Sequence, residues 1–181
     1  MRTPKFFTGS ELLLLHDEER RSAVSSLYTD DPAGVLTLSI CSLLSSSLTK
    51  LSFHVYEELE RFTEEQEEAL HLLNSLHELG FLHCMKLQRL PAGLTKLTNL
   101  KRLQIWRCPA IQLLPKDRLP SSLQELEIYG CPAIKSLPKD ALPSSLRELH
   151  VYGDNNEELK RQCRKLKGTI PIVADYRAKG Y

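Results

Sequence analysis

The sequence predicts an α/β repeat solenoid, with a short parallel β-sheet on the concave face and irregular or short helical segments on the convex face. Three observations predict this fold. Residues 98–120 and 121–143 are near copies, identical at 13 of 23 positions. The identical residues are mainly Leu, Ile, Cys and Pro, so an apolar skeleton repeats while the other positions vary. Prolines between the copies prevent long helices there. A chain that repeats one short unit is typical of a repeat architecture.

One apolar motif recurs at a nearly constant spacing. The pattern LxxLxIxxC over residues 100–108 has equivalents that begin at residues 76, 123 and 146, so successive units are 24, 23 and 23 residues apart. This motif and period are those of a leucine-rich repeat. Alternate residues of a strand share a face, so Leu103 and Ile105 are expected to point into the core together. The spacing predicts parallel strands over residues 78–82, 102–106, 125–129 and 148–152.

The motif sets the expected limits of the repeat region at residues 35–153, with five to six units. A fifth unit begins at Leu48, and the pattern VxxLxI over residues 35–40 is the candidate for a sixth. In the last unit, Asp154 stands where the others have cysteine. Residues 1–34 carry no repeat motif, and we expect an irregular or weakly helical lead-in there.

The segments outside the strands have signals of their own. Leu-Pro pairs after each cysteine favour an irregular or 3₁₀ convex face. Thr63-Glu64-Glu65-Gln66 has the form of a capping box and predicts a helix from about Glu64 to Ser75. Residues 154–173 are expected to form a C-terminal helical cap, because acids begin this segment, bases follow, and Gly168 precedes a short extended apolar end. Residues 174–181 are treated as a tail.

Composition limits the classes of partner and compartment. The 24 basic and 23 acidic residues leave a net charge of +1, so no overall field favours nucleic acid or an anionic membrane. The basic run over residues 160–167 is expected to be the solvated face of the cap, and contact with phosphate groups is the alternative. Cysteines recur once per unit at 84, 108 and 131, which indicates buried, reduced thiols rather than a disulfide framework. The longest early apolar run, Leu12–Leu15, is too short for a signal peptide or a membrane span. We therefore expect a soluble, cytoplasmic protein.

The outward positions of neighbouring strands are expected to form columns on the concave face. Exposed aromatic residues beside charged ones are typical anchors of protein interfaces. Trp106, Tyr129 and Tyr152 share one column, and the alternative for them is simple ring stacking. The predicted protein-binding residues are Arg102, Gln104, Trp106, Glu125, Glu127, Tyr129, Glu148, His150 and Tyr152.

No catalytic or metal-binding pattern accompanies these residues. The sequence has no GxSxG or HExxH motif, and neither CxxC nor HxxxH pairing accompanies His77, His83 and Cys84. The acidic pairs near Asp17 and Glu57 are expected to be solvated surface. We therefore expect no enzyme, no metal and no cofactor in this chain.

The runs LTKLTNLKRLQIWRCPAIQLLPKDRLPSSLQELEIYGCPAIKSLPKDALPSSLRELHVYG and ELKRQCRKLKGTIPIV resemble the C-terminal leucine-rich repeats of grass intracellular disease resistance proteins. These are coiled-coil-type immune receptors with a nucleotide-binding NB-ARC domain, and the resemblance covers about residues 35–173. No GxxxxGK[ST] motif occurs among the 8 glycines, so ADP or ATP would bind an NB-ARC domain that this sequence lacks.

The resemblance implies a recognition module in plant innate immunity. Such a module senses a pathogen effector directly or through a guarded host protein, and it contributes to autoinhibition within the receptor. The expected partners are therefore proteins, including other domains of the same receptor, with no nucleic acid and no membrane span. The alternatives are a substrate-recognition or scaffold repeat protein, such as a ubiquitin-ligase adaptor, and a truncated receptor fragment with no independent role.

Overall fold

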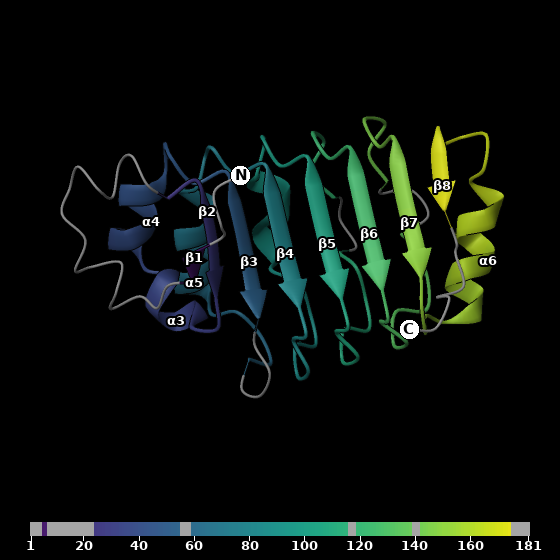
Figure 1. Ribbon diagram of the computed structural model, residues 1–181, viewed down its shortest axis with the longest axis horizontal. Helices are drawn as coiled ribbons and strands as arrows, with labels where there is room; N and C mark the ends of the chain where they lie inside the picture. The colour runs from purple at the N-terminus through teal and green to yellow at the C-terminus, as the bar shows by residue number, and fades with distance from the viewer. Residues whose placement is uncertain (1–4, 7–23, 55–58, 116–118, 139–141, 175–181) are drawn as a thin grey trace.

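The computed structural model describes residues 5–6, 24–54, 59–115, 119–138 and 142–174, and its centre is one parallel sheet (Figure 1). Within these residues the sheet has eight strands in sequence order, so each strand pairs with its neighbours along the chain. The four strands predicted from the leucine motif, β4 to β7, are confirmed residue for residue. The strands are β1 Lys5–Phe6, β2 Ser26–Thr29, β3 Lys50–His54, β4 Glu78–Leu82, β5 Arg102–Trp106, β6 Glu125–Tyr129, β7 Glu148–Tyr152 and β8 Ile172–Ala174.

The register of the sheet aligns equivalent residues of successive units. Leu103 pairs with Leu79 on one side and with Leu126 on the other. All three leucines are fully buried, as the motif predicts. Burying one leucine contributes about 1.5–3 kcal/mol, but only when a neighbouring unit covers it. Each unit is therefore stable only within the stack.

The cysteine of each unit lies in the turn after its strand, and its thiol bonds to the strand of its own unit and to the strand of the preceding unit. Cys108 Sγ donates to the carbonyl oxygens of Phe81 and Trp106, both at 3.3 Å, and Cys131 repeats this arrangement one unit later. In the next unit the role belongs to Asn155, whose side-chain amide donates to the carbonyls of Ile128 and Tyr152. The sequence alignment placed Asp154 at this position, and that placement is wrong by one residue. Asp154 is exposed, whereas Asn155 is buried and can satisfy the two carbonyls.

The residue that follows each of the strands β4 to β7 adopts a left-handed conformation. The φ angles are +55° at His83, +51° at Arg107, +62° at Gly130 and +79° at Gly153. The first three of these residues donate their backbone N–H to the last residue of the next strand, which extends the ladder by one bond. Glycine adopts this conformation without strain, whereas a residue with a Cβ is destabilised by roughly 1–2 kcal/mol. His83 after β4 and Arg107 after β5 therefore keep a side chain at a position where glycine fits better.

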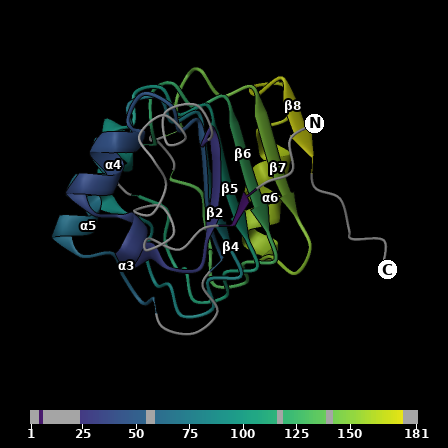
Figure 2. The ribbon, with the colours of Figure 1, turned by 60° about the vertical axis from the view of Figure 1, so that its left-hand side comes forward.

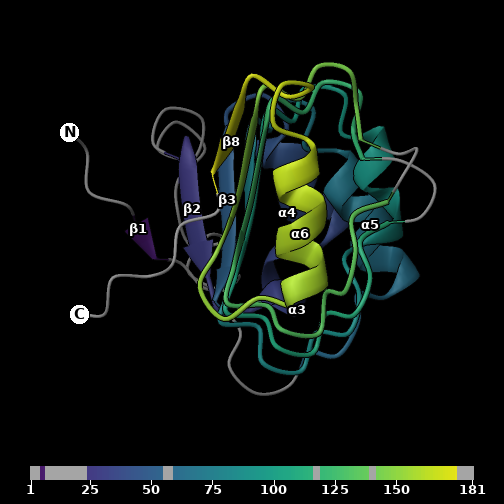
Figure 3. The ribbon, with the colours of Figure 1, turned by 90° about the vertical axis from the view of Figure 1, so that its right-hand side faces the viewer.

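The helices lie on one side of the sheet, as the turned views show for α4, α5 and α6 (Figures 2 and 3). Apolar residues on this side form a continuous core with the leucines of the strands. The segments opposite β4 to β6 contain a 3₁₀ helix and otherwise irregular structure among the described residues, as the prolines predict. The helical elements are α3 Pro32–Val35, α4 Leu38–Leu44, α5 Glu64–His71, the 3₁₀ helix η1 Ala92–Lys96, and α6 Glu157–Lys165.

The N-terminal repeat lies earlier in the chain than the sequence predicts. Residues 35–40 do not form a strand, because Asp31 and Thr37 cap the short helices α3 and α4. The strand of this unit is β2, which pairs in register with β3 and places Leu27 in the leucine core. Residues 26–34 are therefore ordered and not an irregular lead-in. Most of the predicted lead-in, residues 1–4 and 7–23, lies outside the described residues.

The two predicted helices form with their expected caps. The capping box at Thr63 and Gln66 is present, with both reciprocal hydrogen bonds, although α5 ends at His71 and not at Ser75. In α6, Asn156 is the N-cap and Gly168 has a φ of +92° beyond the end. The extended apolar segment that follows forms β8, which pairs parallel with β7. The C-terminal segment thus covers the last repeat with a helix and one more strand.

Candidate protein-binding face

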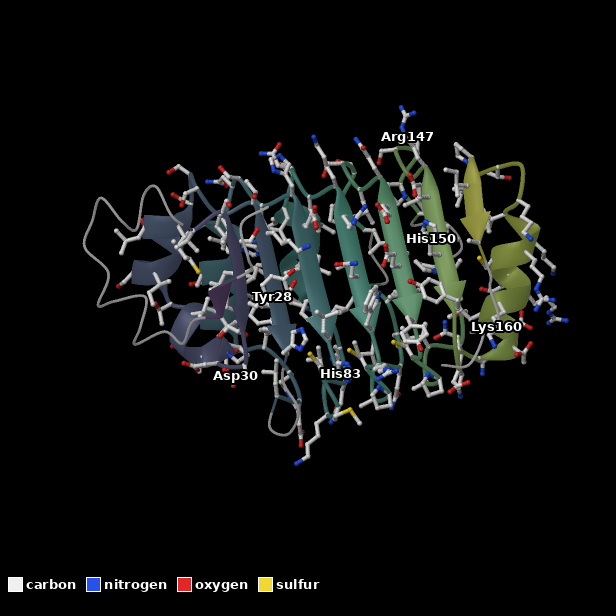
Figure 4. The ribbon with its side chains drawn as sticks, viewed as in Figure 1. Tyr28, Asp30, His83, Arg147, His150 and Lys160 are labelled. Atoms are coloured by element: carbon white, nitrogen blue, oxygen red, sulfur yellow. The ribbon has the colours of Figure 1, made fainter. Side chains whose placement is uncertain are left out.

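The face of the sheet that points away from the helices carries the predicted binding residues. We call it the outer face, and it comprises the alternate residues of β2 to β7 that point away from the leucine core. In Figure 4, Tyr28 on β2 and His150 on β7 lie on this face. The register aligns the predicted residues of β5, β6 and β7 in three rows across the strands. The first row holds Arg102, Glu125 and Glu148, the second holds Gln104, Glu127 and His150, and the third holds Trp106, Tyr129 and Tyr152. All nine residues are half-buried: Arg102, Gln104, Trp106, Glu125, Glu127, Tyr129, Glu148, His150 and Tyr152.

Ion pairs connect neighbouring strands in the first row. Lys50 Nζ lies 3.1 Å from Glu78 Oε2, and the guanidinium of Arg102 binds Glu125 Oε2 through Nε at 2.7 Å and a terminal nitrogen at 2.6 Å. Burial opposes the charge of Arg102, but Glu125 and other nearby acids outweigh burial and raise the pKa of the guanidinium. Arg102 on β5 is therefore tied to Glu125 on the neighbouring strand β6.

Glu127 accepts two hydrogen bonds at one oxygen. Gln104 Nε2 and Trp106 Nε1 both donate to Glu127 Oε2 at 3.1 Å. Burial alone would raise the pKa of Glu127, but the bonds from Glu125, Gln104 and Trp106 and the charge of Arg102 bring it below its ordinary value. Burial and contact with Glu127 raise the pKa of Glu125 despite the opposing effect of Arg102. Glu127 is thus the anion that fixes the Trp106 indole.

The three aromatic residues form a continuous row at the ends of the strands. The rings of Trp106 and Tyr129 meet edge to face with centroids 6.1 Å apart, and those of Tyr129 and Tyr152 are 5.1 Å apart. The guanidinium of Arg107 lies over the Tyr129 ring at 5.6 Å. The rings therefore stack on each other, as the alternative expects, and they still keep an accessible surface.

A second group of rings lies toward the N-terminus, beside β2 to β4, and sequence reasoning missed part of it. Tyr28 and His54 have ring centroids 6.3 Å apart, and His54 and His83 are 6.1 Å apart. Burial, together with the charge of His83, lowers the pKa of His54. Tyr28 lies opposite Ser52 in the middle row, and it was missed because β2 is a strand that its weak motif did not predict.

One group of side chains has the composition of a metal site. The oxygens of Glu125 and Glu148 and a ring nitrogen of His150 lie within 4.8 Å of one another, and His150 Nε2 is 3.2 Å from Glu148 Oε2. The sequence showed no such pattern, because the three residues come from two adjacent strands. A comparison of aligned units would have found it, since Glu125 and Glu148 are equivalent positions.

A shallow groove lies at the strand ends beside the aromatic row. Its volume is about 420 Å³, and its lining includes His83, Arg107, Tyr129 and Asp154. Figure 4 shows His83 at this edge of the sheet and Arg147 at the opposite edge. The sequence did not predict the groove. The recurrence of glycine at 130 and 153 was the signal that a special turn follows each strand.

The basic run of α6 is largely paired within its own helix. Lys160 lies 2.9 Å from Glu157, Arg161 pairs with Glu158, and Arg164 lies 3.8 Å from Glu157. These pairs agree with the expectation of a solvated cap face. Figure 4 shows Lys160 on α6, at the end of the molecule beyond β7.

No protein-family model matches the sequence, and no curated protein matches it. Among the residues that the structure describes, none of the helices has both the length and the apolar composition needed to cross a membrane.

Proposed function

We propose that the chain is a leucine-rich-repeat solenoid that binds another protein through its outer face. The observation that carries this proposal is the contrast between the two sets of strand residues. The core positions of β4 to β7 hold only Leu, Ile, Val or Phe, whereas the outer-face rows mix charged, polar and aromatic residues, as Gly80, Gln104, Glu127 and His150 do in the second row. A constant scaffold that varies one exposed face is the design of repeat proteins that bind other molecules.

The outer face also has the chemistry of a protein interface. Trp and Tyr are enriched among the residues that dominate binding energy, and they work best where neighbours exclude water. Trp106 is held by Glu127 and Tyr129, so little side-chain freedom is lost when a partner binds. The five-residue strands β3 to β7 hold these side chains on a rigid support.

Within this proposal, the biological setting is the one that the sequence resemblance implies. The chain acts as the recognition region of a plant intracellular immune receptor in the cytoplasm, and it contributes to keeping the receptor inactive. Its partner is a pathogen effector, a guarded host protein or another domain of the receptor. Binding needs no catalytic residue and no cofactor in this chain.

The test is co-precipitation from grass leaf extract with the purified chain as bait. The first variant combines Trp106→Ala with Tyr129→Ala and removes both rings. The second, Trp106→Phe, keeps a ring at this position but removes the N–H donor. Leu113→Ala is the matched control, because Leu113 is exposed and lies outside the strands. We expect proteins that the wild type and the control retain to be lost from the double variant and reduced with Trp106→Phe. Equal retention by all four folded baits would refute the proposal.

A further inference from the structure

The outer face between β4 and β7 has more negative than positive charge. Glu78 on β4 is paired with Lys50, but three further glutamates, at 125, 127 and 148, point to this face against one arginine at 102. Glu125 and Glu148 lie directly opposite each other on β6 and β7. Like charges in this arrangement destabilise a sheet. The face therefore keeps an acidic pair that folding alone does not favour.

The single arginine does not neutralise this group. Both contacts of Arg102 go to one oxygen of Glu125. Glu127 receives its hydrogen bonds from the neutral donors of Gln104 and Trp106. Glu148 is paired with the His150 ring. A further positive charge would thus find three carboxylates within one small area.

The aromatic row borders the carboxylates on the side of the strand ends. The face of an aromatic ring attracts cations, and arginine is the most frequent partner in proteins. The structure itself contains one example, because the Arg107 guanidinium lies over the Tyr129 ring. A guanidinium also donates in a planar fork that suits two carboxylate oxygens, whereas a lysine ammonium is a point charge.

We propose that the outer face over β6 and β7 binds an arginine side chain from an extended basic segment of the partner protein. The guanidinium donates to Glu148 and Glu127, and its plane rests against the aromatic row at Tyr152. The partner surface is complementary in charge to the outer face. This inference rests on the proposed function and specifies the kind of partner that it involves.

A divalent cation on Glu125, Glu148 and His150 fits these observations less well. The Arg102 guanidinium lies on Glu125 and repels a second cation placed there. A metal ion would also have to bind His150 Nε2, which already contacts Glu148 Oε2 at 3.2 Å. The aromatic row would have no part in such a site. An arginine uses both the carboxylates and the rings.

The experiment selects phage-displayed random twelve-residue peptides on the whole purified chain. Affinities of the selected peptides are then measured for the wild type, for Glu148→Gln, and for the control Glu65→Gln. Glu65 is an exposed acid of α5, on the other side of the sheet. Glu148→Gln keeps the shape and removes a charge that faces Glu125, so we expect the fold to be as stable as the wild type. The Trp106→Ala, Tyr129→Ala double variant reports whether the peptides use the outer face at all.

We expect selected peptides to be rich in arginine and to bind Glu148→Gln about 10- to 100-fold more weakly, with no change for Glu65→Gln. Changing the peptide arginine to lysine should weaken binding, and added salt should do the same. Selected peptides without arginine, unchanged affinity for Glu148→Gln, or binding that requires Zn²⁺ and is abolished by EDTA would overturn the inference. If such peptides still lose affinity for the double variant, the proposed function stands and only the arginine assignment fails. Peptides indifferent to the double variant contradict both.

Discussion

The backbone of the turn after β7 holds the ring of Tyr129 in place, and Gly153 permits this close approach. A Cβ on residue 153 would lie 2.5 Å from Tyr129 Cε2 and 2.7 Å from Cδ2. The ring cannot move away easily, because it packs against Trp106 and Tyr152. We therefore predict that Gly153→Ala both destabilises the fold and displaces the aromatic row.

The expected magnitude has two parts. Gly153 has a φ of +79°, and an alanine in this conformation destabilises the fold by roughly 1–2 kcal/mol. The overlap with the Tyr129 ring adds the effect of overpacking, about 1–3 kcal/mol. Gly168→Ala is the matched control, since Gly168 has a φ of +92° and nothing lies within 4 Å of its Cβ position. Only the first part applies to Gly168.

The assay is urea unfolding followed by circular dichroism, with fluorescence of the single tryptophan recorded on the same samples. Gly153→Ala should be less stable than Gly168→Ala by about 1–3 kcal/mol and should change the native fluorescence of Trp106. Equal stability of the two variants, with an unchanged spectrum, would show that the turn does not position the ring.

Three further predictions concern the core, the thiols and one carboxylate. Leu126→Ala should lower the free energy of unfolding by about 2–5 kcal/mol in urea titrations, because Leu126 is fully buried between two other leucines; a loss under about 1 kcal/mol would contradict the stacked core. The thiols of Cys84, Cys108 and Cys131 should resist alkylation in the native protein and react after unfolding. The same is expected of Cys41, because burial raises its pKa to about 12. Rapid labelling of the native protein in mass spectrometry, or an intact 108–131 disulfide in protein from the cytosol, would argue against buried, reduced thiols. Glu127 has a folded-state pKa below its ordinary value, so its charge stabilises the fold above pH 4.5, and this contribution is lost as the pH falls through the lower folded-state pKa. Glu127→Gln should therefore be less stable than the wild type at pH 7 but not in strong acid, and a difference that is independent of pH would contradict this assignment.

The sequence was sufficient to predict β4 to β7 because their motif is strong. Leucines spaced for one face of a strand, at a fixed period, leave few alternatives for burying them. The motif failed at the N-terminus, where Thr29 replaces a large apolar residue in β2. Residues 35–40 matched the motif in letters, but the capping side chain of Thr37 selects a helix there. Local hydrogen bonds thus outweighed apolar spacing.

The candidate site was predictable in position but not in detail. Strand register follows from the aligned units, so the nine outer-face residues could be placed on one face in advance. The roles of Glu127 and Arg107 could not, because they depend on side-chain rotamers and on a left-handed turn. The change from Cys131 to Asn155 was missed because the last turn is one residue longer before its polar side chain.

The indole of Trp106 is the most direct reporter of another protein binding on the outer face. The chain contains one tryptophan, so its ¹H–¹⁵N spectrum should show a single indole signal, from the N–H that donates to Glu127. A protein retained by the wild-type bait should shift or broaden this signal at stoichiometric concentration. An unchanged indole signal with the partner fully bound would place recognition elsewhere on the molecule and contradict the proposed function.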